Sequence, residues 1–131
     1  MAKIIHTMIR VLDLERSMKF YADVLGLEPS HRLDFPDFSL VYLRNAQNDF
    51  EIELTWNKGR AEPYTHGDGY GHVAVVVDDA AATRAAVAAK GYEPLPVKEF
   101  KRGEELLARF FFIQDPDGYK IEMLERHGHY R

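Results

Sequence analysis

The chain repeats itself, and this internal repeat most constrains its fold. The stretch HTMIRVLDLERSMKFYADVLGLEP, which begins at His6, aligns with HVAVVVDDAAATRAAVAAKGYEP, which begins at His72. In each copy an aspartate, Asp13 or Asp79, follows the histidine at the same separation, and a glycine two residues before a Glu-Pro pair comes near the end. An aspartate before a helical stretch and a glycine after it are typical helix caps. The sequence therefore predicts two copies of one supersecondary unit.

The first copy is predicted to contain one helix and four strands. A strand over 6–12 precedes a helix over 13–25, in which apolar side chains recur at helical spacing. Strands over 38–43 and 50–56 flank the polar turn RNAQND, and a further strand over 28–33 is expected before them. The resulting order of elements is βαβββ.

The second copy yields the same order. A strand over 71–77 is followed by a helix over 79–90 and by a strand over 92–97. Strands over 107–114 and 119–124 then flank the turn DPDG, in which proline and glycine favour a tight reversal. We therefore expect a second βαβββ module.

Two polar segments complete the organisation. The stretch NKGRAEPYTHGDGYG is rich in glycine, proline and polar residues, which is typical of a linker. We expect an α+β fold in which residues 1–131 form a single domain of two βαβββ modules, at about 1–60 and 70–131. The segment 98–109, which begins KEFKRGEE, has mixed charge and is expected to be a surface loop.

Composition excludes several classes of protein. The net charge of −4 and the lack of a basic stripe argue against nucleic-acid binding. No stretch approaches the roughly 20 apolar residues of a membrane span, and the N-terminal sequence lacks the apolar region of a signal peptide, so a cytoplasmic protein is expected. Because there is no cysteine, a metal site must use histidine, aspartate or glutamate.

Each copy carries one histidine at its first strand and one glutamate on its last strand, giving the pairs His6 with Glu53 and His72 with Glu122. Taken singly, each side chain is ordinary, but the matched placement in a duplicated unit favours a shared site. Two neutral imidazoles and two carboxylates balance a divalent cation, which compensates carboxylates placed in an apolar sheet. This donor set suits nickel, cobalt, zinc, manganese or ferrous iron better than calcium or magnesium. On a six-coordinate ion it leaves two positions open, as in a catalytic site.

Two more polar residues share a strand face with these candidates. Arg10 lies four residues after His6, and Asn57 lies four residues after Glu53. Because side chains alternate along a strand, each points to the same side as its candidate ligand. A guanidinium and an amide beside a metal suit a substrate that carries a carboxylate. We therefore expect Arg10 and Asn57 to bind substrate.

These residues resemble the glyoxalase I (lactoylglutathione lyase) family of the vicinal oxygen chelate superfamily. The matching text is HTMIRV, DLERSMKFYADVLGL, IELTWN, YGHVAV and DPDGYKIEML, and together these motifs span nearly the whole chain. The resemblance implies that the metal ligands are His6, Glu53, His72 and Glu122. It also implies that Glu122 is the principal proton-transfer base, with Glu53 able to serve for the other substrate epimer.

The resemblance also implies an activity and an assembly. The implied reaction is the isomerisation of the methylglyoxal–glutathione hemithioacetal to S-lactoylglutathione through an enediolate, with Arg10 and Asn57 holding the glutathione portion. The short chain is similar to the bacterial type that nickel or cobalt activates, with zinc as a further candidate. Members pair their modules across a homodimer, so that each site lies at the subunit interface and contains residues of both chains.

Two alternatives stay open beside this one. The first is another metal-dependent isomerase or epimerase of thiol adducts or acyl-CoA; methylmalonyl-CoA epimerases have this layout but usually carry glutamine at the position of Glu53. The second is a non-enzymatic module that binds a small molecule, as in drug-sequestering proteins of the same fold. Those proteins need no complete metal set, so the four candidate ligands favour an enzyme.

Overall fold

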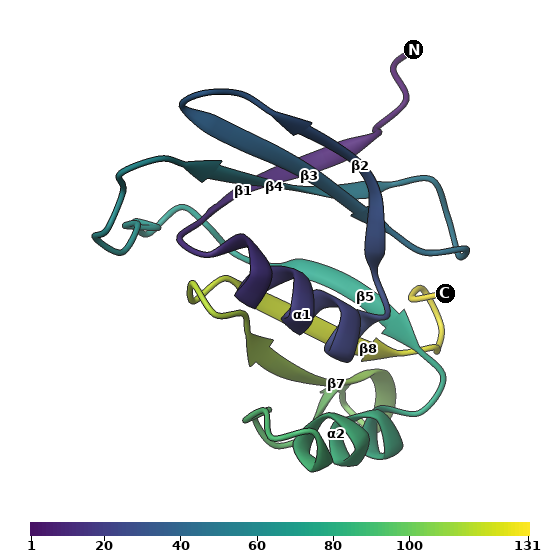
Figure 1. Cartoon of the computed structure of the whole chain (residues 1–131). Coiled ribbons are helices and arrows are strands. Elements are labelled where there is room, and N and C mark those ends of the chain that lie inside the picture. The colour runs from purple at the N-terminus through teal and green to yellow at the C-terminus, as the bar shows by residue number, and fades with distance from the viewer. The chain divides into compact units, whose positions relative to one another are not determined.

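The computed structural model describes residues 1–131, which form two compact units, Met1–Thr65 and His66–Arg131. Each unit contains one helix and one four-stranded sheet (Figure 1). Neither helix is long and apolar enough to cross a membrane.

The first unit has the element order βαβββ. Its elements are β1 (His6–Val11), α1 (Leu14–Leu25), β2 (Glu28–Asp34), β3 (Phe38–Arg44) and β4 (Glu51–Asn57). Strand β1 pairs in parallel with β4, while β3 is antiparallel to both β4 and β2, so the sheet order is β1-β4-β3-β2. The first and last strands of the unit are therefore neighbours, and this adjacency brings their side chains together.

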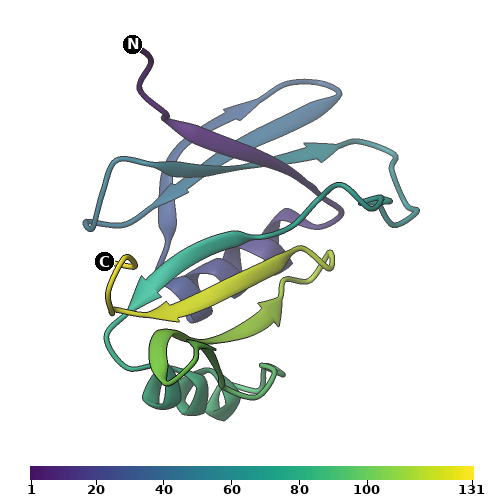
Figure 2. The same cartoon turned by 180° about the vertical axis from the view of Figure 1, so that it is seen from behind.

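The second unit repeats this topology, and Figure 2 shows its first strand (teal) and its last strand (yellow) running in the same direction. Its elements are β5 (Val73–Val77), α2 (Ala80–Ala89), β6 (Lys98–Arg102), β7 (Glu105–Gln114) and β8 (Lys120–Glu125). Strand β5 is parallel to β8, and β7 is antiparallel to β8 and to β6, in the order β5-β8-β7-β6. The predicted α+β fold of two βαβββ modules is confirmed.

The predicted helix caps explain why both helices begin where they do. The carboxylates of Asp13 and Asp79 each accept a hydrogen bond from the backbone amide three residues further on, at 3.1 and 2.9 Å. These bonds satisfy amide groups that have no partner inside the helix. At the other end of α1, Gly26 adopts the left-handed conformation with φ 64°, which glycine allows without strain.

The two sides of the first sheet differ in character. On one side the side chains are apolar and at most 6% exposed: Ile9, Val11, Val41, Leu43, Ile52 and Leu54. The opposite side mixes polar side chains with Met8, Phe38 and Leu40, and two of its polar residues, Glu53 and Thr55, are buried. A strand with one apolar side normally exposes its other side to water. Strand β4 departs from this rule at the position of a candidate ligand.

The strand expected over 92–97 is absent, and this prediction is wrong. Pro94 and Pro96 lie within the segment and cannot donate to a strand ladder, which explains the failure. The segment still contacts the sheet at one point, where the backbone amide of Leu95 donates to the carbonyl of Phe112 at 2.8 Å.

The loop expected over 98–109 is also wrong, because these residues form the hairpin of β6 and β7. The hairpin turns at Gly103, whose φ is 62°. All five residues of β6 are exposed, and the strand pairs only with β7. An edge strand of this kind tolerates charge on its exposed faces, so its sequence lacks the apolar period of an inner strand.

Candidate metal and substrate site

The first candidate pair lies on neighbouring strands of the first unit. His6 begins β1, and the parallel register places Met8, two residues later, opposite Glu53 on β4. The Nε2 atom of His6 lies 3.5 Å from Oε1 of Glu53. The glutamate side chain is 11% exposed and the imidazole is 36% exposed. The pair therefore combines a buried carboxylate with an imidazole that a ligand can reach.

The second pair has nearly the same geometry. His72 lies immediately before β5, and Ala74, two residues later, is opposite Glu122 on β8. The Nε2 atom of His72 lies 3.4 Å from Oε1 of Glu122, and the side chains are 39% and 17% exposed. The duplicated topology thus places a histidine beside a glutamate twice.

Both pairs fit a divalent cation. Bonds from one ion to an imidazole nitrogen and to a carboxylate oxygen measure roughly 2.0–2.2 Å, so two adjacent ligands lie about 3 Å apart. The nitrogen–oxygen separations of the two pairs approach that value. Neither unit gathers three or more histidine, aspartate or glutamate side chains around one point.

Two hydroxyl groups hold the carboxylate of Glu53. The hydroxyl of Thr55 donates to Oε2 of Glu53 at 3.1 Å. Tyr42 lies directly opposite Glu53 on the antiparallel neighbour β3 and is also hydrogen-bonded to it. This hydrogen bond, followed by burial and the charges of Glu53 and Glu51, raises the pKa of Tyr42 from 10.0 to about 12. The phenol therefore stays protonated and donates.

Glu122 has a different environment. The residue opposite it on the antiparallel neighbour β7 is Phe112, and the residue two positions further along β8 is Leu124. Neither side chain carries a hydroxyl. The ring of Phe112 instead lies edge-on to the ring of His72, with centroids 5.2 Å apart. The two glutamates occupy equivalent positions but are held differently.

The predicted substrate residues share a side of the first sheet with His6 and Glu53. Arg10 is exposed on β1, opposite Thr55 in the register with β4. Asn57 ends β4 and is half-buried, and its Oδ1 lies 3.5 Å from the hydroxyl of Tyr64. The guanidinium and the amide can therefore contact a ligand that lies against this side of the sheet.

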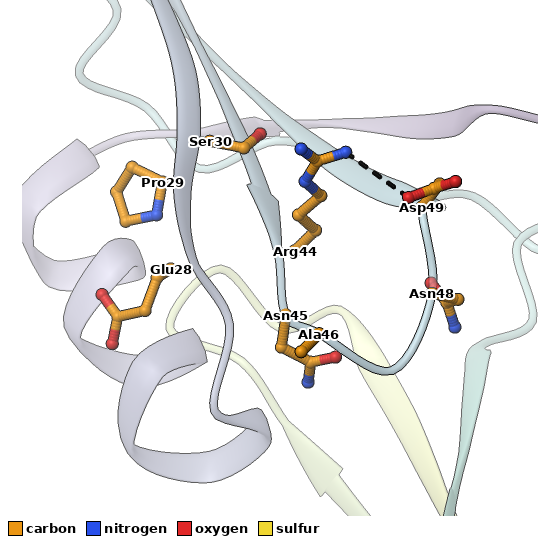
Figure 3. Close-up of a pocket in the computed structure, with 8 residues that line it drawn as sticks. All are labelled: Glu28, Pro29, Ser30, Arg44, Asn45, Ala46, Asn48 and Asp49. Carbon is orange, nitrogen blue, oxygen red and sulfur yellow. Dashed lines mark ion pairs between the residues drawn. The ribbon is translucent and has the colours of Figure 1, made fainter.

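A separate shallow pocket of about 450 Å³ lies elsewhere in the first unit (Figure 3). It is lined by Glu28, Pro29, Ser30, Arg44, Asn45, Ala46, Asn48 and Asp49. The guanidinium of Arg44 turns toward Asp49, with an ion-pair separation of 3.8 Å (Figure 3). None of the predicted ligand or substrate residues lines this pocket, so we do not assign it to the candidate site.

Sequence reasoning did not identify Tyr42 or assign a role to Thr55. Tyr42 alternates with Leu40 and Phe38 along β3, so its position indicated packing alone. The signal that would have identified it is the hairpin register, because pairing across the turn RNAQND places it opposite Glu53. Register depends on loop geometry, which the residue pattern did not define.

Comparisons with known proteins show the family of the chain. The family model for the Glyoxalase/Bleomycin resistance protein/Dioxygenase superfamily matches residues 3–123. The chain is 45% identical to lactoylglutathione lyase of Haemophilus influenzae, over 94% of this chain and 92% of that protein.

Solved structures show the same likeness. The trypanothione-dependent glyoxalase I of Leishmania major superposes with a TM-score of 0.76 at 34% identity, covering 95% of this chain and 87% of that chain. Glyoxalase I of Zea mays superposes with a TM-score of 0.84 at 30% identity, covering 96% of this chain and 45% of that longer chain. The chain has duplicated βαβββ units and is similar to these proteins over nearly all of its own length. It therefore belongs to the Glyoxalase/Bleomycin resistance protein/Dioxygenase superfamily.

Proposed function

We propose that this protein is a lactoylglutathione lyase, or glyoxalase I, which converts the hemithioacetal of methylglyoxal and glutathione into S-lactoylglutathione through an enediolate. The observation that carries the proposal is the repeated histidine–glutamate pair, at 3.5 Å in one unit and 3.4 Å in the other. It occurs in a chain that is similar over nearly its full length to lactoylglutathione lyases.

His6, Glu53, His72 and Glu122 would together hold one divalent cation. Nickel or cobalt is favoured, and zinc is a further candidate, because imidazole and carboxylate donors suit all three. When bound, the cation supplies Lewis-acid polarisation of the substrate oxygens, which makes the neighbouring carbon more acidic.

Glu122 is the residue that moves the proton. Its carboxylate removes the proton from the carbon that bears sulfur and returns it to the adjacent carbon, so the glutamate ends the cycle as it began. The side chain is 17% exposed, which leaves it accessible to substrate. Phe112 opposite it supplies an apolar wall without a competing hydrogen-bond donor.

Arg10 and Asn57 orient the thiol portion of the substrate. The guanidinium of Arg10 pairs with a glutathione carboxylate, and the amide of Asn57 hydrogen-bonds to a polar group of the peptide. Both lie on the side of the first sheet that carries His6 and Glu53, as strand alternation requires.

We further propose that the protein acts as a homodimer in the cytoplasm. In this arrangement each site takes one histidine–glutamate pair from each of two chains; neither unit alone gathers three or more candidate donors. The cytosolic glutathione pool supplies the thiol of the substrate.

The decisive experiment uses metal-free protein titrated separately with nickel, cobalt and zinc. Formation of the thioester is followed by ultraviolet absorbance with methylglyoxal and glutathione as substrates. Activity should rise in proportion to the metal added and reach a plateau. Absence of turnover with all three metals would reject the proposal.

A comparison of thiols separates the proposed enzyme from its alternatives. The hemithioacetals of glutathione, trypanothione and coenzyme A are assayed under the same conditions, because the Leishmania major relative is trypanothione-dependent. Preference for the glutathione adduct supports the proposal. Turnover of the coenzyme A adduct alone would favour an isomerase of another thiol adduct, and metal-free protein that binds a small molecule without turnover would favour the binding module.

A further inference from the structure

The two units differ at one matched pair of positions beside their glutamates. Tyr42 is opposite Glu53 in the strand register of the first unit, and Phe112 is opposite Glu122 in the second unit. The two side chains have nearly the same shape and differ by one hydroxyl. Tyr42 faces Glu53 across the strand pair, and hydrogen bonding to that carboxylate is the main cause of the raised pKa of Tyr42.

The next position along each last strand differs in the same sense. Thr55, two residues after Glu53, donates to its Oε2 at 3.1 Å, while Leu124 takes the equivalent place after Glu122. Two hydroxyl groups therefore lie next to Glu53 in the strand register. The equivalent positions of the second unit hold side chains without a hydroxyl. The Glu53 side chain is also the more buried of the two glutamates, at 11% exposed against 17% for Glu122.

The hydrogen bond from Thr55 also fixes which oxygen of Glu53 faces its histidine. Thr55 holds Oε2, which leaves Oε1 at 3.5 Å from Nε2 of His6. Partners of this kind orient a metal ligand and tune its affinity. The ring of Tyr42 also contacts the imidazole of His6 edge-on, with centroids 5.6 Å apart, so one side chain touches both members of the pair.

We propose that Tyr42, assisted by Thr55, is a positioning residue that fixes Glu53 as a permanent metal ligand and thereby restricts proton transfer to Glu122. The inference rests on the proposed function and departs from what the resemblance implies, namely that Glu53 can serve as base for the other substrate epimer. A carboxylate held by two hydroxyls and an ion rotates little, whereas a base must turn toward the carbon that it deprotonates.

The first test is the affinity for nickel without substrate, measured by competition with a chromophoric chelator. Tyr42→Phe removes the hydroxyl and keeps the ring, so nickel should bind roughly tenfold more weakly, within the range for a lost partner of a ligand. Thr55→Val should weaken binding in the same direction. Tyr130→Phe, which removes a hydroxyl from the C-terminal segment, should leave the affinity unchanged. Unchanged nickel affinity in Tyr42→Phe would overturn the proposal, whatever the result for Thr55→Val.

The second test asks whether Glu53 gains freedom. Glu122→Gln should have low residual turnover, and the double variant Tyr42→Phe with Glu122→Gln should have more, because the released Glu53 carboxylate can then act as base. A merely structural role for Tyr42 predicts a further loss instead, and that result would overturn the proposal. Circular dichroism of each variant verifies that the fold is retained.

The reciprocal substitution provides a matched test in the second unit. Phe112→Tyr places a hydroxyl opposite Glu122, so kcat should fall while nickel affinity stays the same or increases. An unchanged kcat would count against the division of labour between the two glutamates. The nickel measurements need no substrate, so they decide the role of Tyr42 even if the wild-type protein fails to isomerise the hemithioacetal and the proposed function is rejected.

Discussion

The Nε2 atom of His72 lies 3.4 Å from Oε1 of Glu122, and the equivalent atoms of His6 and Glu53 lie 3.5 Å apart. The agreement follows from topology, since both units pair their first strand in parallel with their last. In each unit the residue two positions after the histidine is opposite the glutamate. A duplicated fold thus produces a duplicated pair of donors.

Loss of either histidine should abolish tight metal binding. We expect His6→Ala and His72→Ala each to reduce nickel affinity by at least about a hundredfold, because a site that loses one of four ligands also loses its geometry. Competition with a chelator and elemental analysis of the purified variants measure the effect. His129→Ala, in the C-terminal segment, is the matched control and should bind like the wild type; equal affinity in all three variants would contradict the ligand assignment.

Glu122→Gln should retain the fold and lose the chemistry. The substitution keeps the size of the side chain and removes its ability to accept the proton, so kcat should fall roughly 10²- to 10⁴-fold, as for loss of a general base. Steady-state assays with a saturating metal concentration measure the change. Glu105→Gln changes a glutamate that pairs with Arg102 at the surface and should leave kcat unaltered. Full turnover by Glu122→Gln would remove this residue from its proposed role.

Much of the fold could be predicted from the sequence because its signals are local. Asp13, Asp79 and Gly26 mark helix ends through hydrogen bonds and dihedral angles that depend on near neighbours. The repeat of these marks predicted two equal units. Strand β6 was not predicted, although the equally exposed edge strand β2 was expected; the position of β6 follows from its pairing with β7.

The same contrast applies to the candidate site. His6 and Glu53 could be selected as partners because the second copy carries a histidine and a glutamate at matching positions, and such a match can be seen in the sequence without a structure. The role of Tyr42 depends on strand register, and a shift of one residue would turn its hydroxyl to the opposite side of the sheet. Convergence of both pairs on one cation remains a prediction.

Arg10 should affect substrate binding more than metal binding. We expect Arg10→Ala to lower kcat/KM by about tenfold to a hundredfold, mainly through KM, because a charge-assisted hydrogen bond is lost. Nickel affinity should be unchanged. Arg126→Ala provides the control, since Arg126 pairs with Asp78 at the surface. An unchanged KM for the hemithioacetal would exclude Arg10 from the substrate site.

The N-cap of α1 should contribute measurably to stability. Asp13→Ala removes the acceptor for a backbone amide at 3.1 Å, and we expect the free energy of unfolding to fall by about 1 kcal/mol. Asp13→Asn keeps an acceptor oxygen and should preserve most of that stability. Denaturant unfolding followed by circular dichroism compares the two variants. Equal stability of the alanine variant and the wild type would mean that solvent replaces the cap.

Subunit mixing tests whether each site draws its two pairs from different chains. His6→Ala inactivates the first unit, and His72→Ala inactivates the second. In a dimer whose sites combine the first unit of one chain with the second unit of its partner, a mixed dimer contains one doubly substituted site and one intact site. Random reassociation makes about half of the dimers mixed, so about a quarter of wild-type activity should return.

The expected recovery assumes that the intact site of a mixed dimer turns over at the wild-type rate. The control mixes two preparations that both carry His6→Ala, in which every site lacks the same ligand and activity should stay absent. Size-exclusion chromatography with light scattering verifies that the mixed sample is dimeric. If mixing the two variants restores no activity although mixed dimers form, each site is built within one chain, and the proposed interface between subunits is wrong.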